Sequence, residues 1–315
     1  MAVRCWQASA VAGAGEAVMN VLVTGANGYL GQALCPYLVA SGYHLVTLTR
    51  QPYGLQGTVN IPVPDYLVSL PEQAFVGQEV VIHLAARAHQ PGSASKRIDE
   101  EYRRINVDTT LAIAHAALRA GARRFIFLSS IKVNGEVTTG LPFRSSDPPK
   151  PGDAYGRSKW QAEQALTALF DKTGTELVIV RPPLIWGGAP KGNLATLVRL
   201  IDLKIPLPFK SLRNRRDLVS LGNLCSLIRC CLDHPAAAGQ TLLVSDARPR
   251  STAEIIWLIS SQAKFSPRLV AFPTSLLRLL RHVPVIGTKL DKLISNLEVD
   301  IGQTQTLLGW QPEMD

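Results

Sequence analysis

Short apolar runs alternate with longer helical stretches between Asn20 and Arg181, and this alternation restricts the fold more than any other feature. Strands that alternate with helices form a parallel sheet wound on both faces. The runs at 80–82 and 125–128 are apolar without alternation, which is typical of central strands buried on both sides. The sequence therefore predicts an α/β fold. The strand-like runs are 21–23, 45–48, 80–84, 125–129 and 177–180, and the helical stretches are 29–40, 98–120 and 155–170.

Three glycines follow the first strand-like run, where the next helical stretch opens. Gly25, Gly28 and Gly31 have GxxGxxG spacing. Such a turn needs glycine for its tight bend, for close approach of backbone to a pyrophosphate, and for packing of helix on strand. The helix amino terminus supplies amide donors for the phosphates. We therefore predict a Rossmann-type dinucleotide site, whose turn comprises Gly25, Asn27, Gly28, Tyr29, Leu30 and Gly31.

The end of the second strand-like run predicts which dinucleotide is bound. An acidic residue at this point would bind both hydroxyls of the adenosine ribose and would repel a 2′-phosphate. The run ends in Leu48, Thr49 and Arg50, without a carboxylate. Because the Arg50 guanidinium can pair with a phosphate, the sequence favours NADP(H), with NAD as the alternative.

Beyond Arg181, prolines and glycines interrupt the alternation, and short mixed elements follow. Ligands of open α/β sheets bind at the carboxyl ends of the strands, which a second lobe can cover. We predict an NAD(P)-binding domain over 19–183, to which some later segments return, and a smaller, mainly substrate-binding C-terminal lobe over 184–315. Residues 1–18 are expected to be a disordered or spurious extension, because Arg4 and Glu16 make them a poor signal peptide.

Composition and charge limit the environments and the binding partners that suit this protein. At 46% hydrophobic residues the chain is too apolar for disorder, and runs such as 80–86 are too short to cross a bilayer. The five cysteines form no CxxC pair, which suits reduced thiols in the cytoplasm. The net charge of +9 is not organised as a basic block with interleaved aromatics, so no nucleic acid is expected. The densest basic cluster would suit one diphosphate: Lys210, Arg213, Arg215 and Arg216.

Tyr155 and Lys159 form a YxxxK pair on a predicted helix. Side chains four residues apart share a helix face, so the ammonium can lie beside the phenol and lower its pKa. Ser130, at the end of an upstream strand-like run, could hydrogen-bond a reacting oxygen and hold it toward Tyr155. Together the three residues predict hydride transfer at a carbinol carbon with Tyr155 as the proton donor or acceptor. The histidines show no metal-ligand spacing, so no metal is expected.

The order of these motifs resembles the extended short-chain dehydrogenase/reductase family of nucleotide-sugar epimerases, dehydratases and ketoreductases. The resemblance covers nearly the whole chain from Met19. It implies that Lys159 binds the nicotinamide ribose, that Arg216 binds the diphosphate of a UDP-sugar, and that the protein forms a homodimer. His83 is expected to be packed rather than catalytic. The coenzyme-binding residues expected outside the glycine turn are Arg50, Leu84, Ala85, Ala86, Asn106, Ser129, Tyr155, Lys159 and Pro182.

The residues after Ser130 distinguish the reactions of this family. Family dehydratases carry a Thr-Asp-Glu run there, because removal of water needs a carboxylate acid and base. This chain has Ser130, Ile131 and Lys132, so dehydration is not expected. The family epimerases hold NAD through an acid at the position of Thr49. A ketoreductase that consumes exchangeable NADPH agrees better with the residues present.

Stretches 127–135, 191–193 and 213–216 look like the bacterial subgroup that reduces a UDP-4-keto-6-deoxy-N-acetylhexosamine to UDP-N-acetylquinovosamine for surface polysaccharide synthesis. Two alternatives stay open: a 4-epimerase of UDP-glucose or UDP-N-acetylglucosamine, and a non-enzymatic NADP(H)-binding sensor or interaction module. The substrate-binding residues expected from the resemblance are Ser130, Lys191, Asn193, Arg213 and Arg216.

Overall fold

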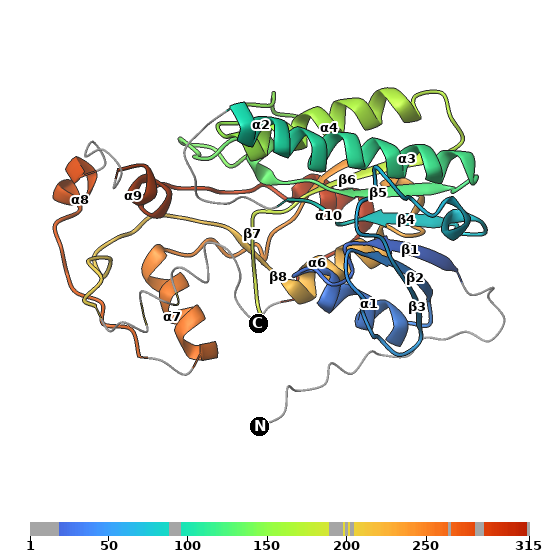
Figure 1. Ribbon diagram of the computed structural model, residues 1–315. Helices are drawn as coiled ribbons and strands as arrows, with labels where there is room; N and C mark the ends of the chain where they lie inside the picture. Colours follow the sequence, from blue (N-terminus) through green and yellow to red (C-terminus); the bar gives the residue numbers. More distant parts are fainter. Residues whose placement is uncertain are drawn as a thin grey trace.

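The computed structural model describes residues 19–87, 96–188, 198, 201, 205–263, 266–280 and 287–313. At its centre is a seven-stranded parallel sheet (Figure 1), in the order β3-β2-β1-β4-β5-β6-β9. The predicted doubly wound parallel sheet is thereby confirmed, whereas the predicted extension at 1–18 lies outside the described residues. The strands are β1 (Asn20–Thr24), β2 (His44–Thr49), β3 (Thr58–Pro62), β4 (Val80–His83), β5 (Arg124–Leu128), β6 (Glu176–Arg181) and β9 (Thr241–Leu243).

The strand order reverses at β1, because β2 and β3 lie on one side of it and the later strands on the other. Thr24, the last residue of β1, is level with Leu48 on one neighbour and His83 on the other. The glycine turn, the end of β2 and the end of β4 therefore meet at one edge. This is the position at which open α/β sheets bind ligands.

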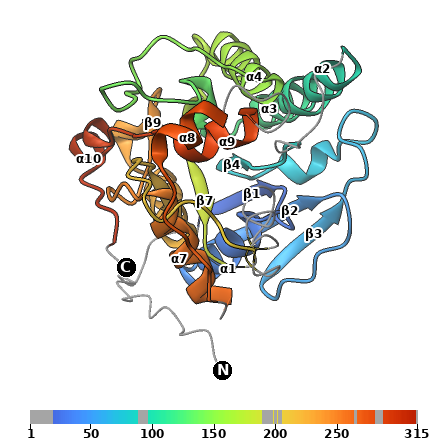
Figure 2. The ribbon, with the colours of Figure 1, turned by 90° about the vertical axis from the view of Figure 1, so that its left-hand side faces the viewer.

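Helices cover both faces of the sheet, as Figures 1 and 2 show from two sides. One core joins the sheet to helices α1, α6 and α10, and the other joins it to α3 and α4. The helices of these layers are α1 (Gly31–Ala40), α2 (Lys96–Arg103), α3 (Thr109–Arg119), α4 (Ala154–Phe170), α6 (Leu221–Cys230) and α10 (Gly302–Leu308). Short helical turns are η1 (Glu72–Phe75), η2 (Arg104–Asp108), η3 (Ile131–Val133) and η4 (Pro235–Ala237).

A smaller C-terminal lobe has a core of its own, which includes Trp186, Phe209 and Ile256. Its two-stranded parallel sheet pairs β7 (Leu184–Trp186) with β8 (Leu218–Ser220). Its helices are α7 (Thr252–Ala263), α8 (Thr274–Leu280) and α9 (Gly287–Ile294). Because β9, α6 and α10 pack with the large sheet, segments after residue 183 do contribute to it, while the boundary at 183 stays a prediction.

Two local expectations differ from the structure. The stretch 98–120 was expected to be one helix, but the π-helical turn η2 separates α2 from α3. Residues 58–62 lie in a passage that lacks a strand pattern, yet they pair with β2 as the edge strand β3.

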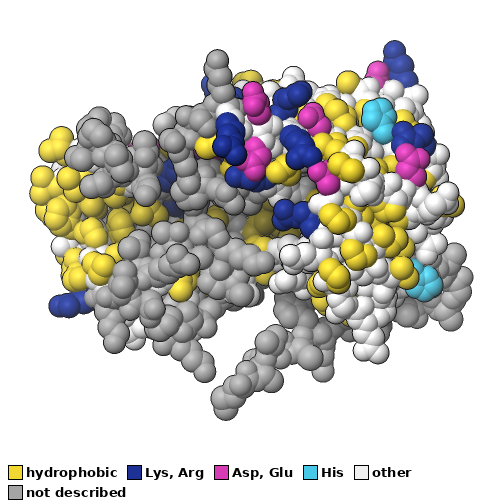
Figure 3. All heavy atoms as spheres, viewed as in Figure 1, with side chains coloured by type: hydrophobic (Ala, Val, Ile, Leu, Met, Phe, Trp, Pro, Cys, Tyr) yellow, Lys and Arg dark blue, Asp and Glu magenta, His cyan; other side chains and the backbone are white. Residues whose placement is uncertain are grey.

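The α2–α4 face carries charges of both signs in close alternation (Figure 3). Arg157 pairs with Asp99 at 3.5 Å, and Arg103 pairs with Asp108 at 3.7 Å. The positive net charge is therefore not concentrated on this face. Among the described helices, none has the length and apolar character needed to span a membrane.

Candidate active site

The turn after β1 packs its glycines directly against neighbouring backbone. Gly25 has a φ of +74°, and a Cβ there would lie 2.7 Å from the amide nitrogen of Ala85. A Cβ on Gly31, where α1 begins, would lie 2.5 Å from the carbonyl oxygen of Ala26. The turn backbone thus packs against the segment after β4 at Gly25 and against the start of α1 at Gly31, with room for no side chain at these two positions. This arrangement fits a bound dinucleotide, whose pyrophosphate the turn amides would hold.

Replacement of Gly25 by Ala tests this close approach, with Gly42→Ala as its control. Both glycines have positive φ, so both changes cost about 1–2 kcal/mol in the left-handed region. Only Gly25→Ala also forces a Cβ into backbone, because nothing lies within 4 Å of a Cβ on Gly42. We expect Gly25→Ala to lose about 1–3 kcal/mol more in urea unfolding. We also expect about tenfold weaker NADPH binding in a fluorescence titration of this variant alone.

The remaining residues of the predicted turn face different surroundings. Leu30 is buried in the core beside α1, and the Asn27 carbonyl accepts a hydrogen bond from Gln32 Nε2 at 3.2 Å. The Tyr29 hydroxyl donates to the carbonyl of Gly187, just after β7. Tyr29 therefore connects the turn to the segment that leads into the C-terminal lobe.

Thr49, the last residue of β2, and Arg50, directly after it, lie in opposite environments. Thr49 is fully buried, and its Oγ1 donates to the Gln51 carbonyl at 2.6 Å and accepts from Asn60 Nδ2 at 2.9 Å. Arg50, the next residue, is exposed. The Thr49 hydroxyl is thus engaged internally, and a cation rather than a carboxylate stands at the exposed end of the strand.

Ser130 and Tyr155 meet at the carboxyl end of β5. Ser130 precedes η3, and its Oγ accepts a hydrogen bond from the Lys132 amide at 3.3 Å. Tyr155 lies in the first turn of α4, and its phenol is hydrogen-bonded to the Ser130 hydroxyl. Burial raises the pKa of Tyr155 above its ordinary range, Asp153 and Tyr102 raise it further, and the Ser130 hydrogen bond opposes them. The phenol is protonated at neutral pH, as a general acid must be.

Lys159 is buried one turn farther along α4. Its Nζ donates to the Leu128 carbonyl at 2.8 Å and lies 4.5 Å from the centre of the Phe127 ring. Burial lowers its pKa to about 7, and Glu163 opposes that shift. The sequence predicted that this ammonium lowers the pKa of Tyr155. The structure differs, because Nζ is directed to β5 and burial dominates at the phenol.

The end of β4 is fixed by a buried histidine. His83 Nδ1 lies 2.7 Å from Thr24 Oγ1, and Nε2 lies 2.9 Å from Thr110 Oγ1. Burial lowers the pKa of His83 to about 3, so the ring is neutral and packed. The half-buried residues that follow, Leu84, Ala85 and Ala86, lie at the edge formed with the glycine turn.

Asn106 links this edge to the helix that carries Tyr155. Its Oδ1 accepts from the Arg87 amide at 2.8 Å, and its Nδ2 donates to Ser158 Oγ at 2.9 Å. Ser158 Oγ in turn donates to the Tyr155 carbonyl at 2.8 Å. The segment after β4, η2 and α4 are thereby held in one hydrogen-bonded chain.

Ser129 and Pro182 join the ends of β5 and β6. The Ser129 amide donates to the Val180 carbonyl at 2.8 Å, and the Ile131 amide donates to the Pro182 carbonyl at 2.9 Å. Both therefore lie beside Ser130.

The predicted substrate-binding residues are only partly brought together. Arg216 is half-buried, burial lowers its pKa to about 10, and its Nη1 donates to the Ser295 carbonyl at 2.8 Å. Arg213 is exposed. Lys191 and Asn193 lie outside the described residues.

Comparison with known proteins places this site in a family. The model of the NAD dependent epimerase/dehydratase family matches residues 21–244, which include the glycine turn, Ser130, Tyr155 and Lys159. The chain belongs to this family. Membership confirms the predicted resemblance at the level of the family, while the ketoreductase subgroup stays a prediction.

Individual relatives in the family have different recorded reactions. A UDP-glucose 4-epimerase from Vibrio cholerae is 38% identical over 297 residues, covering 93% of this chain and 90% of the relative. The ketoreductase from Stigmatella aurantiaca that acts on 4-hydroxy-2-methyl-3-oxo-4-farnesyl-3,4-dihydroquinoline-1-oxide is 26% identical over 278 residues, covering 84% and 79%. The solved structure of MoeE5 in complex with UDP-glucuronic acid and NAD has a TM-score of 0.76, 22% identity and 94% coverage of each chain. At that identity it supports the fold.

The candidate site also contains a buried ion pair that was not predicted from the sequence. Arg181 Nε donates to Glu163 Oε1 at 2.9 Å, and Arg181 Nη1 donates to Asn134 Oδ1 at 2.9 Å. The Ser129 hydroxyl donates to the same Glu163 carboxylate. A signal was present, because Glu163 lies four residues after Lys159 and shares its helix face.

Proposed function

We propose that this protein is a nucleotide-sugar oxidoreductase that uses NADP(H) to reduce a 4-keto sugar. The favoured substrate is a UDP-4-keto-6-deoxy-N-acetylhexosamine, and the product is UDP-N-acetylquinovosamine. The observation that carries the proposal is the hydrogen-bonded pair of Ser130 and a protonated Tyr155 at the carboxyl end of β5, beside buried Lys159. Family membership supports the proposal. The described cysteines are free thiols and none of the described helices could span a membrane, which agrees with action in the cytoplasm.

The chain's own residues supply the acid half of the reaction. When bound, NADPH supplies the hydride that adds to carbon 4. As negative charge develops on the carbonyl oxygen, the Ser130 hydroxyl donates a hydrogen bond to it and Tyr155 Oη transfers its proton. We infer from the family resemblance that Lys159 binds the nicotinamide ribose. The ketone, NADPH and one proton are consumed, and the alcohol and NADP⁺ are formed.

The substrate diphosphate would be held from the C-terminal lobe. We infer that Arg216 binds it, with Arg213, Lys191 or Asn193 as further contacts. Arg216 donates to the carbonyl of Ser295, which directly follows α9. This position supports the assignment, because α9 also reaches the side of the site that holds Ser130 and Tyr155, through the ion pair of Lys292 with Glu136.

A 4-epimerase is the second candidate, favoured by the 38% identity to the Vibrio cholerae UDP-glucose 4-epimerase. An epimerase returns the hydride to the opposite face of the sugar and consumes no coenzyme. The carboxylate that would select NAD is missing after β2, which favours the reductase.

Identification of the coenzyme and of its fate separates the candidates. The purified protein is denatured, and the released nucleotide is identified by mass spectrometry. The 4-keto sugar is then added with NADPH, and loss of NADPH is followed by absorbance. A reductase consumes one NADPH per sugar. An epimerase retains NAD and interconverts UDP-glucose and UDP-galactose with no net consumption, while a sensor binds NADP(H) and does neither.

The prediction that the coenzyme is NADP(H) depends on Arg50, which is exposed directly after β2. Charge-assisted hydrogen bonds contribute about 1.5–3 kcal/mol, so Arg50→Met is expected to weaken NADPH binding by about ten- to a hundredfold. NADH binding should change less than about threefold, because NADH lacks the 2′-phosphate. Arg119→Met, which removes an exposed arginine from α3, is the matched control. Equal losses for NADPH and NADH would contradict the role of Arg50.

A further inference from the structure

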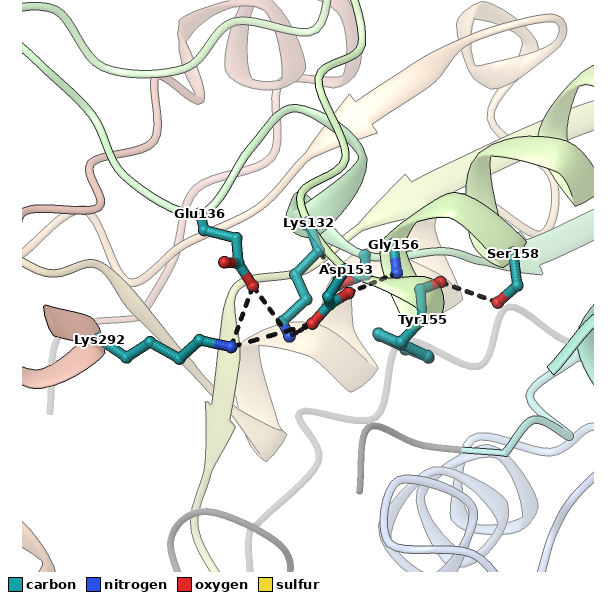
Figure 4. Close-up of polar contacts among 8 residues, drawn as sticks. Lys132, Glu136, Asp153, Tyr155, Gly156, Ser158 and Lys292 are labelled. Atoms are coloured by element: carbon teal, nitrogen blue, oxygen red, sulfur yellow. Dashed lines mark hydrogen bonds and ion pairs between the residues drawn. The ribbon is translucent and has the colours of Figure 1, made fainter. Parts of the chain in front are cut away.

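A cluster of four charged residues lies beside Tyr155 (Figure 4). Lys132, from η3, forms ion pairs with Asp153 and, at 3.5 Å, with Glu136. Lys292, from α9 of the C-terminal lobe, lies 3.1 Å from Glu136 Oε1 and 4.0 Å from Asp153 Oδ2. The side chains of Lys132, Glu136 and Asp153 are each less than one-third exposed. Solvent therefore screens these charges less than those of a fully exposed pair.

Lys132 connects the two segments that carry the reacting groups. It lies two residues after Ser130, whose Oγ accepts a hydrogen bond from its amide. Its partner Asp153 caps α4, because Asp153 Oδ1 accepts from the Gly156 amide at 2.8 Å. The same helix carries Tyr155 and Lys159. The ion pair therefore ties the Ser130 turn to the first turn of α4, where Ser130 and Tyr155 are hydrogen-bonded.

Lys132 also places a positive charge near the phenol. Its Nζ lies 5.8 Å from the centre of the Tyr155 ring, while Asp153 acts on Tyr155 with the opposite sign. Among the residues that the structure describes, Tyr102 from α2 and Ser130 also face the phenol. Lys159, on the same helix, is directed to Leu128. An unbalanced Asp153 would disfavour phenolate and make Tyr155 a weaker acid.

We propose that Lys132 is a positioning residue for Tyr155: by pairing with Asp153 it holds the Ser130 turn against α4 and neutralises the carboxylate nearest the phenol. Lys292 completes the cluster and couples α9 to it. The proposal rests on the proposed function only in that Tyr155 is the proton donor. It also gives Lys132 a task at a position where the family dehydratases carry an acid.

The test is a cycle of Lys132→Met, Asp153→Asn and the double variant. Asparagine keeps an N-cap acceptor, so Asp153→Asn removes charge while it preserves the cap. The titration of Tyr155 is measured in enzyme saturated with NADP⁺, because a nearby positive charge, here that of the bound nicotinamide ring, favours phenolate and opposes the rise in pKa caused by burial. It is followed as the difference in tyrosinate absorbance between each variant and its Tyr155→Phe counterpart. We expect Lys132→Met to move this titration upward by about one pH unit, and the double variant to return it toward wild type. Turnover of the keto sugar should fall about tenfold and then recover in parallel, since one pKa unit corresponds to a factor of ten.

Two controls separate this role from a merely structural one. Lys132→Arg retains the cation and should keep most of the turnover, whereas Lys150→Met removes an exposed lysine nearby and should shift nothing. An unchanged Tyr155 titration in Lys132→Met, or a shift that Asp153→Asn does not reverse, overturns the proposal. The titration needs no sugar, so its result is independent of whether the chain reduces a keto sugar.

Discussion

Replacement of Tyr155 by Phe is expected to lower kcat for keto-sugar reduction by about a thousandfold, because general acid catalysis contributes about 10²–10⁴. The change removes the phenol oxygen that is hydrogen-bonded to the Ser130 hydroxyl, and it leaves the ring near Tyr102 and Lys132. NADPH affinity should stay within about twofold, because the glycine turn and Lys159 are untouched. Stopped-flow loss of NADPH with saturating keto sugar measures the chemical step, and a fluorescence titration measures coenzyme binding.

A matched substitution elsewhere controls for the loss of a phenol as such. Tyr37→Phe makes the same change on α1, away from the end of β5, and should alter neither kcat nor NADPH binding. If Tyr155→Phe retains more than about a tenth of the wild-type turnover, Tyr155 is not the acid and the reductase mechanism fails. If both kcat and coenzyme affinity fall steeply, the variant has lost its structure. The variants of Arg181 and Glu163 described below then show what a loss of structure does to both quantities.

The sequence could predict the parts of this fold that burial and backbone geometry determine. β4 and β5 are continuous apolar runs because both of their faces are covered, and they were found by that pattern. Gly25 was found because its conformation and its contact with Ala85 exclude a side chain. Tyr155 and Lys159 were found because their spacing places both on one helix face.

The missed features depend on contacts between distant segments. β3 contains Asn60 and Pro62, and among the described strands it pairs with β2 alone, so no run of apolar residues marks it. Its strand form follows from that pairing and from Asn60 Nδ2, which donates to Thr47 and Thr49. The stretch 98–120 has no proline or glycine to predict a break. The π-helical turn there brings Asn106 to Ser158, and turns of this kind often occur at functional sites.

The charged groups behind the site were missed for a related reason. Lys132 and Asp153 are far apart along the chain, and a loop brings them together, so the sequence indicated only the absence of an acid after Ser130. Arg181 marked the end of the alternating pattern, but its partner on α4 was not predicted. Helix periodicity shows which face Glu163 occupies, but it does not show what the opposite strand places there.

Replacement of Arg181 by Met is expected to cause the largest loss of stability, about 3–5 kcal/mol, because it leaves a buried carboxylate without its cation. The side chains of Arg181 and Glu163 are only 4% and 2% exposed, and both hydrogen-bond further groups at the end of β5 and in the loop after η3. The double variant Glu163→Gln with Arg181→Met should recover much of the loss, since it removes both charges. Urea unfolding of wild type, both single variants and the double variant gives the coupling free energy between the two residues.

The exposed pair of Arg119 and Glu72 supplies the matched control for that cycle. Their side chains are 57% and 62% exposed, and surface pairs contribute about 0–1 kcal/mol, so Arg119→Met should change the free energy of unfolding by less than about 1 kcal/mol. A loss in Arg181→Met no larger than in Arg119→Met would show that the buried pair is relaxed or hydrated in solution. Ser129 donates to Glu163 and directly precedes Ser130. The variants of Arg181 and Glu163 should therefore also differ in their turnover of the keto sugar. Arg181→Met is expected to lower kcat more than it changes the KM for the sugar, since the pair orders the catalytic turn and does not touch the substrate.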